Sequence, residues 1–414
     1  MAERLNEKTT MWNKDFMCAV VAHFLLCVAH FSSSPLIVTY VEHLGAGVRL
    51  AGLLTGLFFG IALAFRPIVG PAMTRLDKRK LLIFVFILGA ISNVGYALFP
   101  SISAFVFFRF LGGAQFSFVG TLLMALAADH LPRAKLPAGM GIYGTGSAIG
   151  NAIAPSAGEA IFRFGTSTRG ENYGFTLMFL FGAAMLILAL IPTLILVPDK
   201  KTKEEIASTG AWYKNMFTVH AIPTTIVMLF LTIPYSMIFA YMFEFSREQG
   251  IAGVNVFFIV LACTLAVTRP IGGYLIYKFG ISPIMFPAFV LFALSFVFIG
   301  SITTFNMMLF GAFITAIGFG FSQPTIQAMC IQTETPLRRG VATNTIHIAM
   351  DLGLFIGPII GGLVRYQANF SVMFRIGVIP VILAIICFAI IMPIHKRRLE
   401  KLEIIYNQDA QQEK

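Results

Sequence analysis

Apolar stretches of about twenty residues recur along the whole chain, and this feature leaves few possible folds. An α-helix of that length crosses a hydrocarbon core of roughly 30 Å. Only 12% of the residues are charged, whereas 57% are hydrophobic. Because the stretches do not alternate apolar and polar residues, they indicate helices rather than barrel strands. The sequence predicts an all-α integral membrane protein with twelve transmembrane helices, over residues 15–39, 50–70, 81–99, 103–128, 138–161, 175–197, 219–243, 253–275, 283–303, 306–330, 340–363 and 373–394.

The positions of the basic residues predict the topology of a chain whose net charge is +11. If the amino terminus is cytoplasmic, roughly 21 basic residues fall on the cytoplasmic side and about 6 on the other, which is the positive-inside bias. We therefore expect a multi-pass protein of the inner (plasma) membrane with both termini in the cytoplasm. The basic residues then face lipid headgroups, and no nucleic acid is expected as a partner. The first apolar stretch exceeds a signal-peptide core, so we expect an uncleaved anchor.

Two distant blocks of the sequence repeat at one offset. FRPIVGPAMTRLDKRK at residues 65–80 and TRPIGGYLIYKFGISP at residues 268–283 align without gaps, 203 residues apart. The same offset places Gly150 and Pro155 over Gly353 and Pro358. The sequence therefore predicts a duplicated bundle, with six helices in residues 1–197, a cytoplasmic linker at 198–215, and six helices and a short cytoplasmic tail in 216–414. Parallel repeats of this kind are typical of transporters whose halves move about a midplane site.

At these residues the chain resembles the major facilitator superfamily over essentially its whole length, and in particular its proton-coupled drug and sugar efflux branches. Gly70 and Arg75 fit the family's loop between helices 2 and 3, and Gly273 and Lys278 take the matching positions in the second repeat. The resemblance implies that this loop latches the two halves through charge pairs. Thr74 stands where the family usually has aspartate, so Asp77 is the candidate acid. The alternative is a solvated basic turn that only sets the topology.

The second pair of blocks resembles a signature that antiporters of the family carry in helix 5. GNAIAPSAG contains Gly150 and Pro155, and GLFIGPIIGG contains the fuller match, with Gly353, Gly357 and Pro358. Glycines four residues apart allow two helices to approach closely. A proline at this place removes one backbone hydrogen bond. The resemblance favours export over import, and helix packing without any bearing on direction is the alternative.

Three ionisable residues inside the predicted spans are candidates for proton coupling. Arg109 resembles the buried arginine of the family's helix 4 signature, which is associated with proton coupling; snorkelling to the interface is the alternative. His347 and Asp351 lie four residues apart near the middle of one span, so they share a helical face. A midplane carboxylate that gains and loses a proton can be driven by a proton gradient. The alternative is a structural hydrogen-bonded pair. For Glu159 and Glu244, near the outer ends of their spans, the sequence leaves two roles open, as coupling groups or as acids at the membrane interface.

Other polar residues in the spans are candidates for a substrate cavity, with hydrogen bonding between helices as the alternative for each. They are His30, Ser34, Gln115, Tyr143, Tyr235, Gln323, Gln327 and Asn344. His23, Cys27 and His30 form a stripe that permits a soft-metal site, but no acid or CxxC motif flanks it, so no metal site is predicted.

The sequence contains no P-loop, HExxH or GxSxG motif, so we expect no enzyme activity and no cofactor other than the proton as coupling ion. The forty-two phenylalanines and nineteen methionines suit an amphipathic ligand. We predict a monomeric secondary active transporter that exports a small amphipathic organic molecule in exchange for protons by alternating access. The alternatives are a proton-coupled importer of a small organic solute and a membrane receptor that binds a ligand without moving it.

Overall fold

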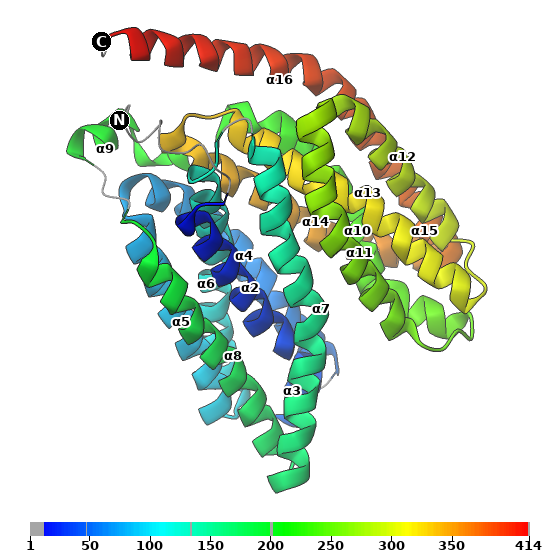
Figure 1. Ribbon diagram of the computed structural model, residues 1–414. Coiled ribbons are helices and arrows are strands. Elements are labelled where there is room, and N and C mark those ends of the chain that lie inside the picture. Colours follow the sequence, from blue (N-terminus) through cyan, green and yellow to red (C-terminus); the bar gives the residue numbers. More distant parts are fainter. Residues whose placement is uncertain (1–11, 47, 133–134, 199–201, 413–414) are drawn as a thin grey trace. The chain divides into compact units, whose positions relative to one another are not determined.

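The computed structural model describes residues 12–46, 48–132, 135–198 and 202–412, and all regular structure within them is helical (Figure 1). Eleven helical segments in this part of the chain are long and apolar enough to cross a membrane. The remaining predicted span, at residues 138–161, is also helical and lies within α7, Leu136–Arg169. It falls outside the apolar set because glycine, serine and threonine are frequent along it.

The elements follow the predicted spans closely. The first part of the chain forms α2 (Lys14–Ser33), the 3-10 helix η1 (Ser34–Leu36), α3 (Ile37–His43), α4 (Val48–Arg75), α5 (Lys78–Leu98), α6 (Ile102–Asp129), α7 and α8 (Glu171–Ile195). The polar stretch after α8 contains α9 (Lys203–Ser208), η3 (Trp212–Asn215) and η4 (Val219–Ala221). The last part forms α10 (Ile222–Glu248), α11 (Val254–Phe279), α12 (Ile281–Ile299), α13 (Phe305–Gln332), η5 (Pro336–Arg338), α14 (Arg339–Gln367), α15 (Phe370–Ile376) and α16 (Val378–Gln412).

The helices group into two compact units. The amino-terminal unit comprises residues 12–127 and 146–216, and the carboxyl-terminal unit comprises residues 128–145 and 217–412. These units differ from the sequence repeats in one respect, because the end of α6 and the start of α7 pack with the carboxyl-terminal helices. The repeat boundaries at 197 and 216 remain a prediction about duplication in the sequence.

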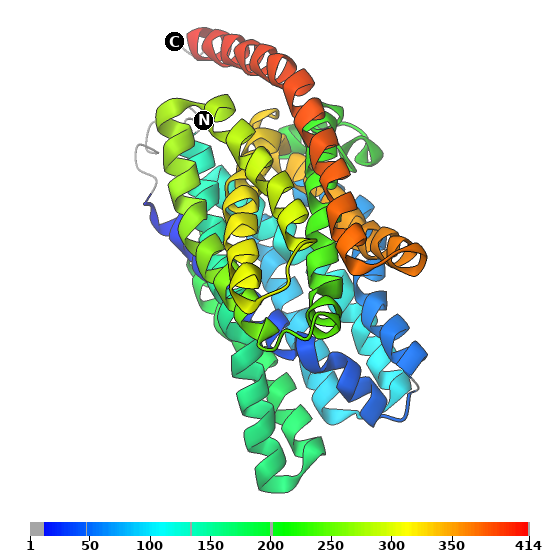
Figure 2. The same cartoon turned by 90° about the vertical axis from the view of Figure 1, so that its right-hand side faces the viewer.

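Equivalent helices pack together in the two units. In the amino-terminal unit α8 packs against α2 and α5 (Figure 1). In the carboxyl-terminal unit the helix at the matching position, α16, packs against α10 and α12 (Figure 2). Buried phenylalanines fill the space between the helices of each unit, and Phe86 and Phe292 are examples with no exposed surface. This packing holds the polar residues of the next section in place.

Candidate functional site

A small polar cavity lies inside the amino-terminal unit, among α2, α4, α5, α6 and α8. Its volume is about 70 Å³. That is room for a few water molecules or one small polar group, and is well below the roughly 300 Å³ at which drug-sized pockets begin. Four of the residues predicted for transport line it together, namely His30, Ser34, Arg109 and Gln115.

A break at the end of α2 shapes one wall of this cavity. α2 ends at Ser33, and Pro35 occupies the following 3-10 helix, since a proline cannot continue the backbone hydrogen-bond pattern. The Ser32 hydroxyl donates to the Ala29 carbonyl at 3.1 Å, and the Ser33 hydroxyl donates to the His30 carbonyl at 3.5 Å. These bonds satisfy backbone oxygens where the helix changes pitch.

Arg109 is buried in the wall of the cavity, with 7% of its surface exposed. Its guanidinium carbon lies 4.6 Å from the ring centre of Phe58 and 5.6 Å from that of Phe105. The electron-rich faces of the rings stabilise the cation in part. The side chain therefore stays inside the bundle.

Aromatic and amide groups form the rest of the polar lining. The imidazole of His30 packs against the rings of Phe58 and Phe116, whose centres each lie 4.8 Å from its own and 5.2 Å from each other. Gln115 is 5% exposed, and its Nε2 makes no hydrogen bond within the part of the chain that the structure describes. A buried amide without a partner is costly, so this N–H group is available to a water or a ligand.

The sequence analysis missed three polar residues of α5 that line the same cavity, Ser92, Asn93 and Tyr96. The Ser92 hydroxyl donates to the Phe108 carbonyl at 2.7 Å, and Asn93 Nδ2 donates to the Gly89 carbonyl at 3.0 Å. A cluster of polar residues inside the apolar run 81–99 was the available signal.

The predicted acid–histidine pair lies in the carboxyl-terminal unit, on α14. Asp351 is 4% exposed and Asn344 is fully buried. Nδ1 of His347 lies 2.8 Å from the Thr343 carbonyl, so this nitrogen carries the proton of a neutral ring and orients it along the helix. The two predicted groups share one face of α14, while Arg109 belongs to the other unit. The coupling roles of the three residues stay predictions.

The glycines of α14 lie against α10. A Cβ atom at Gly353 would lie 2.7 Å from the Cβ of Thr232, and one at Gly357 would overlap the Ser236 hydroxyl. The Ser236 hydroxyl donates to the Gly353 carbonyl at 3.2 Å. Close approach of two backbones over small residues is the usual packing mode of such helices in membranes.

Close contacts between helices also occur at Pro358 and at Gly150, the glycine of the first repeat that matches Gly353. The Tyr241 hydroxyl donates to the Pro358 carbonyl at 2.6 Å. In the amino-terminal unit a Cβ atom at Gly150 would lie 2.8 Å from the Cβ of Cys27, so α7 approaches α2 closely there. Pro155 lies inside α7, five residues further on.

The loop residues of the predicted latch have local partners. Asp77 caps α5, where its carboxylate accepts hydrogen bonds from the backbone N–H groups of Arg79 and Lys80. Arg75 donates to the Gly210 carbonyl at 3.1 Å. Gly70 leaves no room for a side chain against the Asn215 carbonyl. The amino-terminal loop thus holds the polar stretch that follows α8.

The equivalent loop of the second repeat is arranged differently. A Cβ atom at Gly273 would lie 2.6 Å from the Cα of Ala138, so α11 approaches the start of α7. Lys278, at the end of α11, is exposed and lies 5.3 Å from the ring centre of Phe279.

The remaining predicted cavity residues lie in the carboxyl-terminal unit and have mostly helix-to-helix contacts. Gln323 Oε1 accepts a hydrogen bond from Arg269 at 2.7 Å, and Gln327 Nε2 lies 3.5 Å from the Met350 sulfur. The ring of Tyr235 stacks on that of Phe319 with centres 3.7 Å apart. Tyr143 is buried near the start of α7.

The two acids that the sequence left open are both on the surface. Glu159 forms an ion pair with Arg163 one helical turn away, at 2.5 Å, and both side chains are at least half exposed. Glu244 is exposed near the end of α10. Exposed pairs of this kind contribute little to stability.

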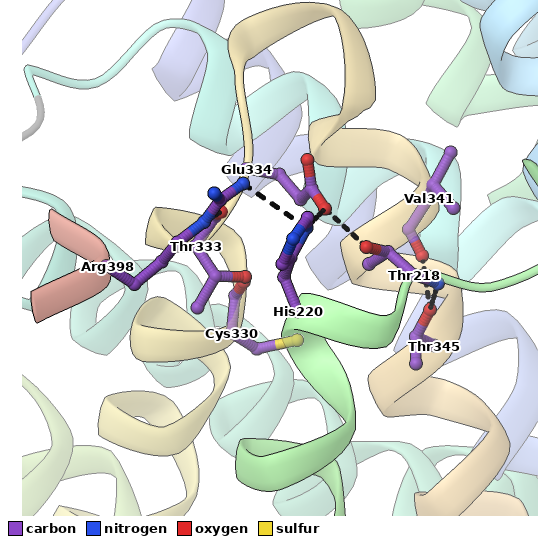
Figure 3. Close-up of polar contacts among 8 residues, drawn as sticks. All are labelled: Thr218, His220, Cys330, Thr333, Glu334, Val341, Thr345 and Arg398. Carbon is purple, nitrogen blue, oxygen red and sulfur yellow. Dashed lines mark hydrogen bonds and ion pairs between the residues drawn. The ribbon is translucent and has the colours of Figure 1, made fainter. Parts of the chain in front are cut away.

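A second polar cluster was not anticipated, because Thr218, Glu334 and Arg398 lie outside the predicted spans and His220 lies at the very start of one (Figure 3). Glu334 is 2% exposed and follows the end of α13. Its Oε1 accepts a hydrogen bond from the Thr218 hydroxyl and lies 2.9 Å from Nδ1 of His220. Arg398 of α16 approaches the same nitrogen at 3.2 Å and donates to the Thr333 carbonyl.

The known proteins that this chain is similar to agree with the architecture. The sequence model of the Major Facilitator Superfamily matches residues 19–281 and 250–403. The chain belongs to this superfamily. The predicted family and the predicted all-α membrane fold are therefore confirmed, and the chain is a multi-pass transporter.

Among curated relatives, multidrug resistance protein MdtG of Escherichia coli (strain K12 / DH10B) is 24% identical over 390 residues, which cover 90% of this chain and 92% of that protein. Solved structures of the superfamily share the fold. The human organic anion transporter MFSD10 (TETRAN) has a TM-score of 0.70 at 16% identity, covering 90% of this chain and 98% of that one. The proton:xylose symporter XylE has a TM-score of 0.73 at 14% identity, covering 91% and 94%.

Proposed function

We propose that this superfamily member exports a small amphipathic organic molecule across the plasma membrane in exchange for protons. Both of its termini lie in the cytoplasm in this proposal. The observation that carries the proposal is the pair on α14, where the carboxylate of Asp351 is almost completely buried one helical turn from His347. An ionisable residue inside a transmembrane helix is a candidate for a functional site, and a proton can reach a buried carboxylate only when the protein gives access to it from one side of the membrane or the other.

In the proposed cycle, Asp351 takes up a proton from outside and releases it to the cytoplasm, and His347, when it is protonated on both ring nitrogens, stabilises the ionised carboxylate. Substrate binds while the carboxylate is ionised and leaves when it is protonated, as exchange requires. The relationship to multidrug resistance proteins supports export over import. The aromatic composition of the chain supports an amphipathic substrate.

The test is dye accumulation in an efflux-deficient bacterium that expresses the chain, with a panel of lipophilic and zwitterionic fluorophores, with and without a protonophore. We expect lower accumulation that the protonophore reverses. Asp351→Asn should abolish the reduction in dye accumulation while the amount of protein in the membrane is unchanged. Glu159→Gln is the matched control, since it removes an acid that is exposed and locally paired, and it should transport normally.

Two results would contradict the proposal. Accumulation above that of cells without the protein would indicate import. Protonophore-sensitive export that persists in Asp351→Asn would remove this carboxylate from the coupling step.

A further inference from the structure

The cavity of the amino-terminal unit has a cationic residue in its wall and no anionic one, which is not expected of a site that holds only water. Its wall contains the buried guanidinium of Arg109. The sixteen described residues that line it include no aspartate or glutamate. A cation on the wall of a low-dielectric cavity attracts an anion strongly, because little water screens the charge.

The hydrogen-bonding groups of the wall point to the same ligand chemistry. Gln115, which is 5% exposed, contributes an Nε2 donor that has no partner within the described part of the chain. The Ser92 hydroxyl and one N–H of the Asn93 amide donate to backbone carbonyls. The guanidinium of Arg109 and the Gln115 amide both belong to the cavity wall, and two donors on one wall suit a ligand that accepts at two oxygens.

Size and surroundings narrow the class of ligand further. A volume of about 70 Å³ accommodates a carboxylate but not an organic molecule that carries one. The rim contains exposed Phe59 and Ser34, and the stacked rings of Phe58, His30 and Phe116 stand beside it. An apolar or aromatic body can pack against these rings while its acidic group enters the cavity.

We propose that this cavity binds the anionic group of the transported molecule, a carboxylate, through the charge of Arg109 and the amide N–H of Gln115. The inference rests on the proposed function and specifies its substrate class as amphipathic monocarboxylates. It gives Arg109 a direct contact with substrate, in addition to the coupling role expected from the resemblance.

The test is equilibrium binding of 1-naphthoate and of uncharged 1-naphthamide to the purified full-length chain in detergent, without a proton gradient. Naphthoate should bind at least about tenfold tighter, since a charge-assisted hydrogen bond is worth about that factor or more. Gln115→Glu places a carboxylate on the wall that also contains Arg109 and should reduce naphthoate binding by about tenfold or more, with naphthamide unchanged. Gln249→Glu, the same exchange at the end of α10, is the matched control and should bind both probes normally.

A second variant and an inorganic anion complete the experiment. Arg109→Lys keeps the charge and should keep the preference for naphthoate, whereas Arg109→Gln should lose it. Chloride is titrated against isethionate at constant ionic strength. Chloride that protects the protein from thermal unfolding, together with equal binding of naphthoate and naphthamide, would show a halide site and overturn the proposal. Equal loss of both probes in Gln115→Glu would overturn it as well.

These outcomes are separate from those of the dye experiment. A transporter of neutral or cationic molecules would export dye and show no preference for naphthoate. A chain that does not exchange substrate for protons would fail in cells and still bind naphthoate through this cavity.

Discussion

The buried carboxylate of Glu334 provides the sharpest test of the energetics of this structure. Its side chain is 2% exposed, whereas that of His220 is 45% exposed, and Oε1 lies 2.9 Å from Nδ1. Removing one partner of a fully buried ion pair costs about 3–5 kcal/mol, and exposed pairs contribute about 0.2–1 kcal/mol. Because only the acid is fully buried and Thr218 still donates to it, we expect His220→Ala to reduce the free energy of unfolding by about 2 kcal/mol.

A double-mutant cycle isolates this interaction from the loss of packing. Glu334→Gln keeps the shape of the side chain and its acceptor oxygen but removes the charge. In that background His220→Ala should cost only about 0.5 kcal/mol, so the coupling energy is about 1.5 kcal/mol. The assay is unfolding in mixed micelles with increasing sodium dodecyl sulfate, followed by circular dichroism at constant pH.

The chain offers a matched control for this cycle. His43 and Glu171 form a second histidine–glutamate pair, with Nδ1 and Oε2 3.2 Å apart and side chains that are 29% and 55% exposed. His43→Ala and Glu171→Gln should therefore couple by at most about 0.5 kcal/mol. Equal coupling in the two cycles, or simple additivity of His220→Ala and Glu334→Gln, would refute the argument that burial of the acid sets the magnitude.

Two further predictions concern the contact between α10 and α14. Gly353→Ala places a methyl group 2.7 Å from the Thr232 Cβ, so it should destabilise the protein by about 1–3 kcal/mol in the same unfolding assay. Gly60→Ala meets nothing within 4 Å and should be neutral or stabilise by about 0.4–1 kcal/mol; similar losses at both positions would contradict the packing argument. Tyr241→Phe removes the hydrogen bond to the Pro358 carbonyl and should cost about 1 kcal/mol, which unchanged unfolding would contradict.

The fold was predictable because its signals are local. Each apolar run is long enough to span the bilayer and does not alternate apolar and polar residues, so a helix is the structure that satisfies its backbone there. The break after Ser33 follows from Pro35, a residue whose effect on a helix does not depend on its neighbours. The length of α7 was less evident from hydropathy, since its many glycines are placed for close packing rather than for lipid contact.

The site was predictable only in part. Arg109 stood out because a charged residue in an apolar run is expensive, and polar residues near mid-span such as Gln115 stood out for the same reason. Which of them meet depends on helix rotation and tilt, which packing sets and the sequence pattern does not display. Glu334 escaped notice because nothing in a loop sequence indicates that a glutamate will be buried, and its partners Thr218 and His220 come from a distant segment.

Comparison of the two repeats distinguishes residues that stabilise the fold from residues proposed to act in transport. At an offset of 203 residues, Arg66 matches Arg269. Arg66 donates to the Ser117 carbonyl of α6 at 2.7 Å. Arg269 donates to the Gln323 side chain of α13, also at 2.7 Å. These arginines therefore stabilise the helix packing that the two repeats share.

The charged and polar residues proposed to act in transport have no such counterparts. The same offset places Ala312 opposite Arg109, Gly318 opposite Gln115, and Ala148 opposite Asp351. A buried charge that only stabilised the bundle would be useful in both copies, as Arg66 and Arg269 are. Costly groups that each occur in one copy alone are better explained by a directional task. The cation in the amino-terminal unit and the acid in the carboxyl-terminal unit fit a division of labour, in which one unit binds an anionic substrate and the other carries the proton.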